Sequence, residues 1–367
     1  MAAICILPFI KIQYDHNKRL SLKTEDPIEN ATALLDNEPS ELEANVLQFT
    51  PDMLDGIEEF NVTLPVGLQE LICYEDSCYM VIDAFWDWGK GFVPSRRLVT
   101  HSFEEAVITA SEIKLESQNF TAENSKNWAI RKDTILGPYL KVMTTAPFIT
   151  KTLTMEKQNP NVLLIGLGGS SINNFFSQLA TEPNVTVVEL MPAMKVIAKK
   201  WFGLRENEKH RVIVGDGAKF VQERSDKEHK FDVILLDACH DFPPYRSVCP
   251  VEIFQEDEII KHIRRNLAEN GTIAINVVLM GEFNDLLQDL LQKYEKHFGS
   301  CYFAHINHQL VLTCTPTKFP RMNDAEYYRR YKENVPDDLK DMLIERVHVR
   351  QDLFEASEHD KADKNEI

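Results

Sequence analysis

The chain has 367 residues, of which 44% are apolar and 26% are charged, and its formal net charge is −17 at pH 7. This length is enough for a sizeable core and for one large or two modest domains. So acidic a surface repels phosphate, so we expect no binding of nucleic acid or of an anionic membrane and would favour a basic protein partner.

Seven cysteines are scattered along the chain. Their spacing matches no zinc site, and we expect no metal. We interpret Cys73 and Cys78 as two thiols in a hairpin and the compartment as reducing, which predicts a cytoplasmic protein. No run reaches the ~18 apolar residues needed to span a membrane. The short apolar start of the chain lacks the basic residues of a signal peptide, so we disfavour one.

Composition and pattern divide the chain into four predicted parts. These are an acidic, partly ordered segment (1–65), a small β-rich domain (66–125), a cofactor-binding domain (126–316) and a charged extension (317–367). In the second part, Gln69–Tyr74 and Tyr79–Phe85 are β-rich runs on either side of a short polar turn, which predicts a hairpin. Arg97–Thr100 is a further candidate strand.

The third part alternates apolar runs with segments of helical pattern. The first run, Val162–Ile165, breaks into the turn Gly166–Gly169, and a helix is expected to start at Ser170 or Ser171, either of which can cap it. Later runs comprise 185–188, 212–214, 231–236 and 271–276. This alternation predicts a parallel sheet with helices on both faces, in which ligands bind at the carboxyl ends of the strands.

Acids follow three of these runs: Glu189, Asp216 and Asp237. Glycine allows backbone to approach a ligand closely, so Gly166 and Gly168 are candidate contacts. A carboxylate after the second strand can hold a ribose diol. Glycine turns also serve plain strand-to-helix connections, and GLGGSS lacks the third spaced glycine of a dinucleotide site. The two later acids suit an adenosine that carries a sulfonium rather than a pyrophosphate.

The remaining pattern is mostly structural. We predict helices over 192–202, 254–267 and 283–298, and a hairpin of Cys301–Ile306 with Gln309–Cys314. Residues 323–334 and 337–354 are expected to be helical, and 355–367 disordered.

Several motifs, GLGGSS, VVELMPAM, VIVGDGAKFV and FDVILLD followed by SVCP, resemble the spermidine-synthase-like S-adenosylmethionine-dependent methyltransferases. The resemblance spans about Gln69 to Thr315. It implies a Rossmann-like α/β fold with a seven-stranded methyltransferase sheet and a small N-terminal β-domain. The implied cofactor is S-adenosyl-L-methionine, and the implied cofactor contacts are Gly166, Gly168, Glu189, Asp216, Gly217 and Asp237.

The sequence departs from this family at three places. Met191 stands where an Asp usually follows the ribose acid by two positions, and Met143 and Thr144 stand where relatives carry a Glu-His pair. In polyamine-making relatives a D-x-x-D motif holds the amine. Here His240 takes the fourth position and Asp241 lies one residue further, a shift of ~3.5 Å.

We interpret the chain as a methyltransferase that acts on a protein amine, at an N-terminus or a lysine, with Asp237 and His240 as catalytic candidates. The resemblance suggests a translation elongation factor as the protein substrate, and a homodimer is a further expectation. Two alternatives stay open: an aminopropyltransferase that uses the decarboxylated cofactor, and a catalytically silent scaffold that keeps the fold.

Overall fold

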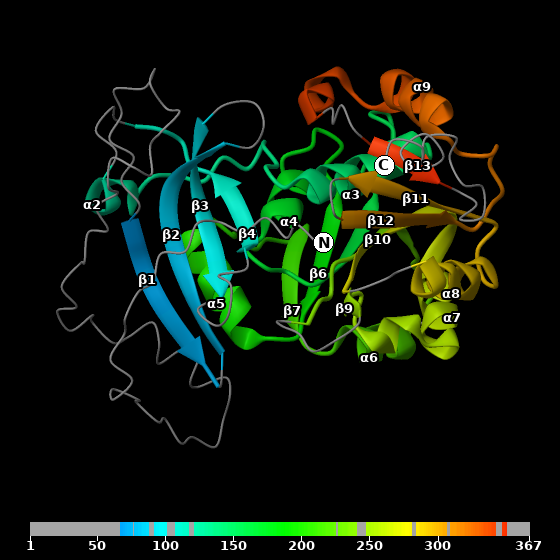
Figure 1. Cartoon of the computed structure of the whole chain (residues 1–367), viewed down its shortest axis with the longest axis horizontal. Helices are drawn as coiled ribbons and strands as arrows, with labels where there is room; N and C mark the ends of the chain where they lie inside the picture. Colours follow the sequence, from blue (N-terminus) through cyan, green and yellow to red (C-terminus); the bar gives the residue numbers. More distant parts are fainter. Residues whose placement is uncertain are drawn as a thin grey trace, which may run out of the picture.

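The computed structural model describes residues 67–350, with gaps at 76, 88–91, 101–106, 117–120, 225–226, 241–246, 281–283, 307–308 and 343–346. Two sheets organise these residues (Figure 1). A four-stranded sheet comes first in the sequence, and a nine-stranded sheet follows. The expectations for 1–65 and for 355–367 lie outside the described residues. None of the helices in the described part is long and apolar enough to cross a membrane.

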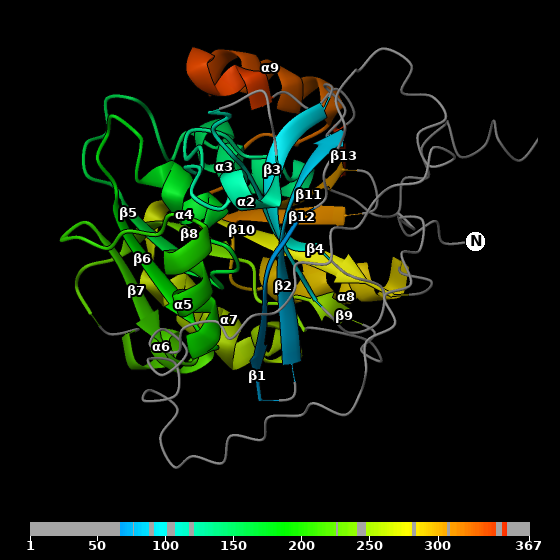
Figure 2. The same ribbon diagram turned by 90° about the vertical axis from the view of Figure 1, so that its left-hand side faces the viewer.

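The N-terminal sheet is antiparallel, in the order β1-β2-β3-β4. Its strands are β1 (Gly67–Tyr74), β2 (Ser77–Asp87), β3 (Phe92–Thr100) and β4 (Val107–Glu112). The predicted hairpin is confirmed, since Tyr74 pairs with Ser77 across the turn. Short helix α2 (Ala122–Ser125) follows. Figure 2 is viewed from the side on which the N-terminal sheet lies, and there this sheet stands in front of the larger domain.

The large sheet runs in the order β13-β11-β12-β10-β8-β5-β6-β7, and β9 pairs with β10. Its strands are β5 (Asn161–Ile165), β6 (Asn184–Glu189), β7 (His210–Val214), β8 (Phe231–Leu236), β9 (Ser247–Cys249), β10 (Leu267–Leu279), β11 (Ser300–Ile306), β12 (Gln309–Thr315) and β13 (Val347–Arg350). Strands β7, β6, β5, β8 and β10 are parallel neighbours. This confirms the α/β class and the central, mostly parallel sheet.

Alternation along the central strands builds a core on each face of the sheet, as a period of two requires. In β5, Leu164 packs in one apolar cluster and Leu163 in the other. The first cluster takes in α3 (Pro138–Ile149), α4 (Ser171–Phe176), α5 (Pro192–Trp201) and α9 (Asp324–Asn334). The second takes in α6 (Gly217–Arg224), α7 (Asp257–Asn266) and α8 (Asn284–Glu295).

Some local predictions were wrong. Residues 337–354 do not form one helix, because Asp337–Met342 is a 3-10 turn and Val347–Arg350 pairs with β11 as an extra edge strand. The helix expected from Phe254 is split into a 3-10 turn, Glu252–Gln255, and α7. The predicted serine cap is absent at α4: Ser170 is left-handed and makes no side-chain cap.

The interpretation of Cys73 and Cys78 as thiols was also wrong. All six cysteines in the described ranges pair, as Cys73–Cys78, Cys239–Cys249 and Cys301–Cys314. Two of these bonds join residues directly opposite each other in hairpins, so the observed strand registers bring the sulfurs together. Disulfides in this number are typical of oxidising compartments, which removes the cysteine argument for a reducing one.

A buried ion pair lies within the N-terminal sheet, and its arginine also reaches the larger domain. Asp83 of β2 is 0% exposed and accepts from Arg96 Nε and Nη2 of β3, both at 2.7 Å. Ser125 Oγ and Gln69 Nε2 donate to the same carboxylate at 2.8 and 3.0 Å. Arg96 reaches further, donating to the carbonyl of Trp201 at the end of α5. The N-terminal sheet is thus tied to the helix that packs on β6 and β7.

Candidate active site

The predicted site residues gather at one edge of the large sheet. Parallel pairing puts the ends of β5, β6, β7 and β8 side by side. Backbone hydrogen bonds continue past the strands, from Gly166 N to Val188 O and from Asp237 N to Ile165 O, both 2.9 Å. The structure therefore brings the glycine turn, Glu189, Asp216 and Asp237 to a common edge, as the sequence predicts.

The glycines of the turn are explained by close backbone packing. Gly166 has φ +96°, and a Cβ there would lie 2.2 Å from the carbonyl oxygen of Asp237. Gly168 has φ +48°, and its Cβ would lie 2.9 Å from Thr109 Oγ1 in β4. The same hydroxyl accepts from Gly169 N at 3.0 Å. The N-terminal sheet thus contacts the turn directly, and contact of these glycines with a cofactor stays a prediction.

Glu189 braces the turn from the end of β6. Its Oε2 accepts from Leu167 N at 2.8 Å and its Oε1 from Met191 N at 2.7 Å, and the residue is 7% exposed. Each carboxylate oxygen has a second lone pair. Binding of a ribose is compatible with this bracing and stays a prediction.

Asp216 and Gly217 stand at the start of α6. Asp216 Oδ1 accepts from Ala218 N at 2.7 Å and from Lys219 N at 3.2 Å, so the side chain caps the helix. A Cβ on Gly217 would lie 2.6 Å from Ile165 Cγ2, which explains that glycine by packing. Neither residue is thereby excluded from cofactor binding, which stays a prediction for both.

An apolar surface adjoins these acids at the ends of β6 and β7. Leu190, which follows the buried strand β6, is 73% exposed, and Val214, the last residue of β7, is 41% exposed. A Cβ on Gly215 would meet nothing within 4 Å, so space is open between Val214 and Asp216. This edge therefore offers an apolar, open surface beside carboxylates.

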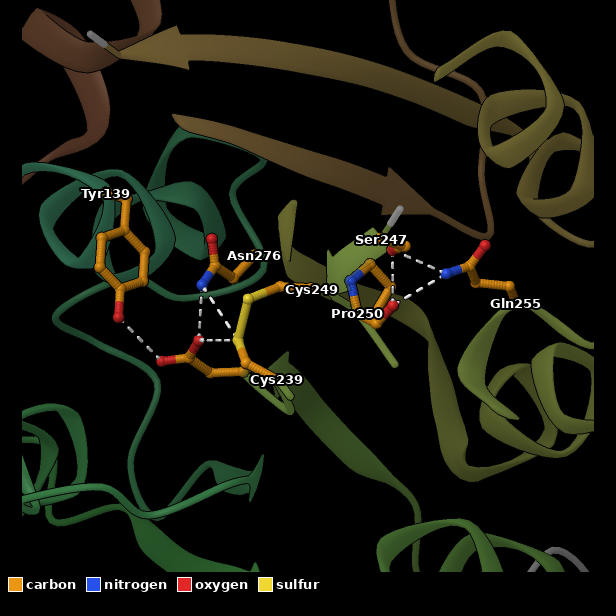
Figure 3. Close-up of a disulfide and its surroundings, with 8 residues drawn as sticks. Tyr139, Cys239, Ser247, Cys249, Pro250, Gln255 and Asn276 are labelled. Atoms are coloured by element: carbon orange, nitrogen blue, oxygen red, sulfur yellow. Dashed lines mark hydrogen bonds between the residues drawn. A yellow bond between two sulfur atoms is a disulfide. The ribbon is translucent and has the colours of Figure 1, made fainter. Parts of the chain in front are cut away.

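Asp237 is half-buried after β8 and is held by two neutral donors. Tyr139 Oη of α3 donates to Oδ2 at 3.3 Å, and Asn276 Nδ2 of β10 donates to Oδ1 at 2.8 Å (Figure 3). Burial raises the pKa of the Asp237 carboxyl above its ordinary value, against the lowering effect of these two hydrogen bonds. Burial and the nearby carboxylate raise the pKa of Tyr139 well above its ordinary value, so its hydroxyl stays a donor.

His240 does not join Asp237. Its Nε2 lies 2.6 Å from Glu252 Oε2, and its backbone N donates to Val248 O. The hydrogen bond from His240 is the main reason why the pKa of Glu252 is lowered. A catalytic role for His240 stays a prediction, and Asp241 lies outside the described residues.

The three departures from the family are explained by packing. Met143 and Thr144 are both 0% exposed in α3, and Thr144 Oγ1 donates to Leu140 O of its own helix. Met191 Sδ accepts from Tyr79 Oη of β2 at 3.3 Å. These side chains belong to the core and to the contact between the sheets.

Two neighbours of Asp237 were not predicted as parts of the site. They are Asn276 and the Cys239–Cys249 disulfide. Asn276 had a signal: it is a polar residue at the end of an otherwise apolar run. The parallel register Ile275↔Leu236 then puts Asn276 beside Asp237. Tyr139 lies on a helix that enters the fold before the sheet, so its contact depends on tertiary packing.

Part of the chain matches the model of a known protein family. Residues 141–319 match the family model described as the spermine/spermidine synthase domain. This part of the chain is therefore similar to that domain. It covers the whole of the edge at which the acids meet.

Curated relatives carry two activities in their names. The eEF1A lysine and N-terminal methyltransferase homolog of Drosophila melanogaster is 28% identical over 122 residues, which are 33% of this chain and 18% of that protein. The polyamine aminopropyltransferase of Vibrio vulnificus is 27% identical over 142 residues, 38% of this chain and 46% of that protein. The chain thus spans about a fifth of the length of the first relative and under half of the second.

A solved structure shares the fold. A structure described as "a probable spermidine synthase" from Corynebacterium glutamicum is 14% identical and has a TM-score of 0.53, covering 72% of this chain and 86% of that one. At this identity the likeness concerns the fold alone. It agrees with a mixed α/β domain that carries an antiparallel sheet ahead of it.

Proposed function

We propose that the chain is an S-adenosylmethionine-dependent methyltransferase that acts on an amine of a protein, at an N-terminus or a lysine. Three findings support the proposal. The domain is spermine/spermidine-synthase-like, relatives are named as eEF1A methyltransferases, and a carboxylate stands at the end of β8. An elongation factor is the protein substrate that the relatives suggest.

The residues at the sheet edge fit such a cofactor. Glu189 stands at the end of β6, where a carboxylate can accept from ribose hydroxyls, and Asp216 Oδ2 accepts no hydrogen bond from the described residues. Exposed Leu190 and the open space at Gly215 suit the flat face of an adenine. When bound, S-adenosylmethionine supplies a methyl group activated on a sulfonium.

The observation that carries the proposal is the set of hydrogen-bond partners around the Asp237 carboxylate. Within the described residues no cation pairs with it, and only Tyr139 and Asn276 donate to it. A half-buried carboxylate with neutral partners can accept an N–H of an incoming amine and orient its lone pair. A free α-amino group has a pKa of about 8 and a lysine about 10.4, so an N-terminal amine needs less help to lose its proton.

The proposal is tested by binding and then by transfer. Calorimetry of the full chain with S-adenosylmethionine and with S-adenosylhomocysteine should detect both ligands. Purified eEF1A incubated with the chain and with cofactor carrying a labelled methyl group should then become labelled, and purified nucleic acid treated in the same way should not. A chain that binds the cofactor and labels no protein in varied extracts would be a silent scaffold.

The aminopropyltransferase alternative rests on the Vibrio relative and on the domain family. The structure lends it less support, because the residue in place of the second acid, His240, pairs with Glu252. We expect no spermidine from decarboxylated S-adenosylmethionine and putrescine. Sustained turnover of that pair would replace the methyltransferase proposal.

Location and assembly remain parts of the proposal. The cytoplasm is the compartment in which an elongation factor would be met, whereas three disulfides favour an oxidising compartment. Mapping the six cysteines in protein purified under native redox conditions decides between them. A homodimer is tested by sedimentation of the same sample.

A further inference from the structure

The Cys239–Cys249 disulfide stands beside the proposed catalytic carboxylate. Cys239 follows Asp237 by two residues, and Cys249 ends β9, where it pairs with Val278 of β10. Asn276 lies two residues before Val278 on the same strand. The bond thus ties the segment after β8 to β9, which pairs with β10, the strand that carries Asn276 (Figure 3).

Three polar groups meet at this bond. Asn276 Nδ2 lies 2.8 Å from Asp237 Oδ1 and 3.6 Å from Cys239 Sγ, and the sulfur lies 3.8 Å from the same Oδ1. A sulfur in a disulfide has no hydrogen, so it can only accept. Asn276 has two N–H groups and can donate to both neighbours.

This arrangement fixes which end of the Asn276 amide faces the acid. Were the amide turned over, its oxygen would face both a carboxylate and a sulfur, neither of which can then donate. Asn276 is 3% exposed, so water cannot easily supply another partner. The sulfur therefore favours the orientation in which Nδ2 donates to Asp237.

We propose that the Cys239–Cys249 disulfide is a positioning element of the active site, which holds Asn276 in the orientation that orders Asp237, and that its reduction lowers methyl transfer. The inference rests on the proposed function, because it assigns Asp237 to the reaction. Cys239, Cys249 and Asn276 act through Asp237 and are positioning residues.

The redox step involves two electrons. A dithiol reductant gives two electrons and two protons to the S–S bond, which becomes two thiols, and the dithiol closes to its own disulfide. The covalent tie to β9 is then lost. Cys239 gains an S–H that can donate to Asp237 Oδ1 and so compete with Asn276.

The other two disulfides provide matched controls. Cys73–Cys78 and Cys301–Cys314 each join neighbouring strands of a hairpin, and within the described residues no hydrogen bond links either of them to Tyr139, Asp237 or Asn276. A disulfide that only stabilises the fold would behave alike in all three places. If Cys239–Cys249 positions the active site, its loss alone among the three should lower turnover.

The first experiment compares Cys249→Ala with the control Cys301→Ala, after peptide mapping has verified the bonds in the wild-type chain. Both substitutions should lower Tm. At 25 °C, Cys249→Ala should reduce kcat for methyl transfer to eEF1A by about tenfold or more, with S-adenosylmethionine affinity within twofold of wild type. Cys301→Ala should leave both quantities unchanged.

Reduction is the second arm. Dithiothreitol should bring wild-type turnover down to the level of Cys249→Ala and leave that variant unaffected. If Cys249→Ala turns over as fast as the wild type, or if reduction affects both alike, the bond is only stabilising and the inference is overturned.

A third readout separates this inference from the proposed function. The side-chain ¹⁵N–¹H signals of Asn276, assigned by their loss in Asn276→Ala, should shift on reduction of the wild type and stay constant in Cys249→Ala. A shift without any methyl transfer would leave the positioning intact and remove the proposed function. Signals that do not respond to reduction would overturn the positioning.

Discussion

Two aspartates, one in each sheet region of the molecule, have opposite surroundings. Asp83, which is buried in the N-terminal sheet, accepts from Nε and Nη2 of one guanidinium and from two neutral side chains. Asp237, at the mouth of the large sheet, accepts from a phenol and an amide only. The first carboxylate is neutralised by its partners and the second is not. An acid with incomplete compensation is the better candidate for chemistry, because a substrate can supply the missing partner.

The largest expected effect is at Asp83. Asp83→Asn leaves Arg96 buried without its counter-charge, and the free energy of unfolding should fall by about 3–5 kcal/mol. Urea unfolding measures this loss. The paired change Asp83→Leu with Arg96→Met serves as control and should cost less than the two single changes together. A loss under 1 kcal/mol for Asp83→Asn would mean that the pair does not stabilise the N-terminal sheet.

Glu189 lies between the two extremes, since its partners are backbone amides. Glu189→Ala removes two hydrogen bonds to a charged group, each of which contributes roughly 1.5–3 kcal/mol. We expect lower stability together with at least tenfold weaker binding of S-adenosylmethionine. Denaturant unfolding and calorimetry on one sample measure both. Weaker binding without any loss of stability would show that the carboxylate serves the ligand and not the turn.

Replacement of Asp237 should raise the stability of the fold, whereas replacement of Asp83 or Glu189 should lower it. Folding raises its pKa above the ordinary value of 3.8, so its contribution to stability is complete below that pH and is lost as the pH rises through the folded pKa. Asp237→Asn, which keeps an acceptor for Asn276, should therefore raise Tm at pH 7.5. The gain should vanish near pH 4. A lower Tm at neutral pH would place Asp237 with Asp83 as a structural acid.

The smallest effect is expected at Glu206, a partly exposed acid. Burial opposes its ionisation, but hydrogen bonds from Lys199, the Val212 amide and Lys195 outweigh this and lower its pKa to about 2. Glu206→Gln should cost about 1 kcal/mol or less at pH 7. Because the pKa is depressed, the difference from wild type should shrink as pH falls from 4.5 towards 2. A difference that grows in acid would contradict the assignment.

Much of the fold follows from local pattern. Apolar runs of strand length, glycine after β5 and acids after β6 and β8 are enough to predict a parallel sheet and the edge at which ligands bind. Extra strand β13 was missed because four residues, Val347–Arg350, carry too short a period to distinguish strand from helix.

The site itself was predicted only in part. Three acids could be predicted from the sequence because each follows an apolar run of strand length: Glu189, Asp216 and Asp237. Tyr139 reaches Asp237 from a helix 98 residues away in sequence, and Thr109 reaches the glycine turn from the other sheet. Such contacts depend on how separate elements pack, which no local pattern specifies.

The most direct test of the central claim is a comparison of wild type with Asp237→Asn in a single turnover on purified eEF1A, at saturating labelled S-adenosylmethionine. The account predicts that the variant binds the cofactor within a few fold of wild type and transfers its methyl group at least a hundredfold more slowly, a loss typical of a removed proton acceptor. Equal rates of transfer by the two proteins would show that Asp237 is structural and would contradict the account.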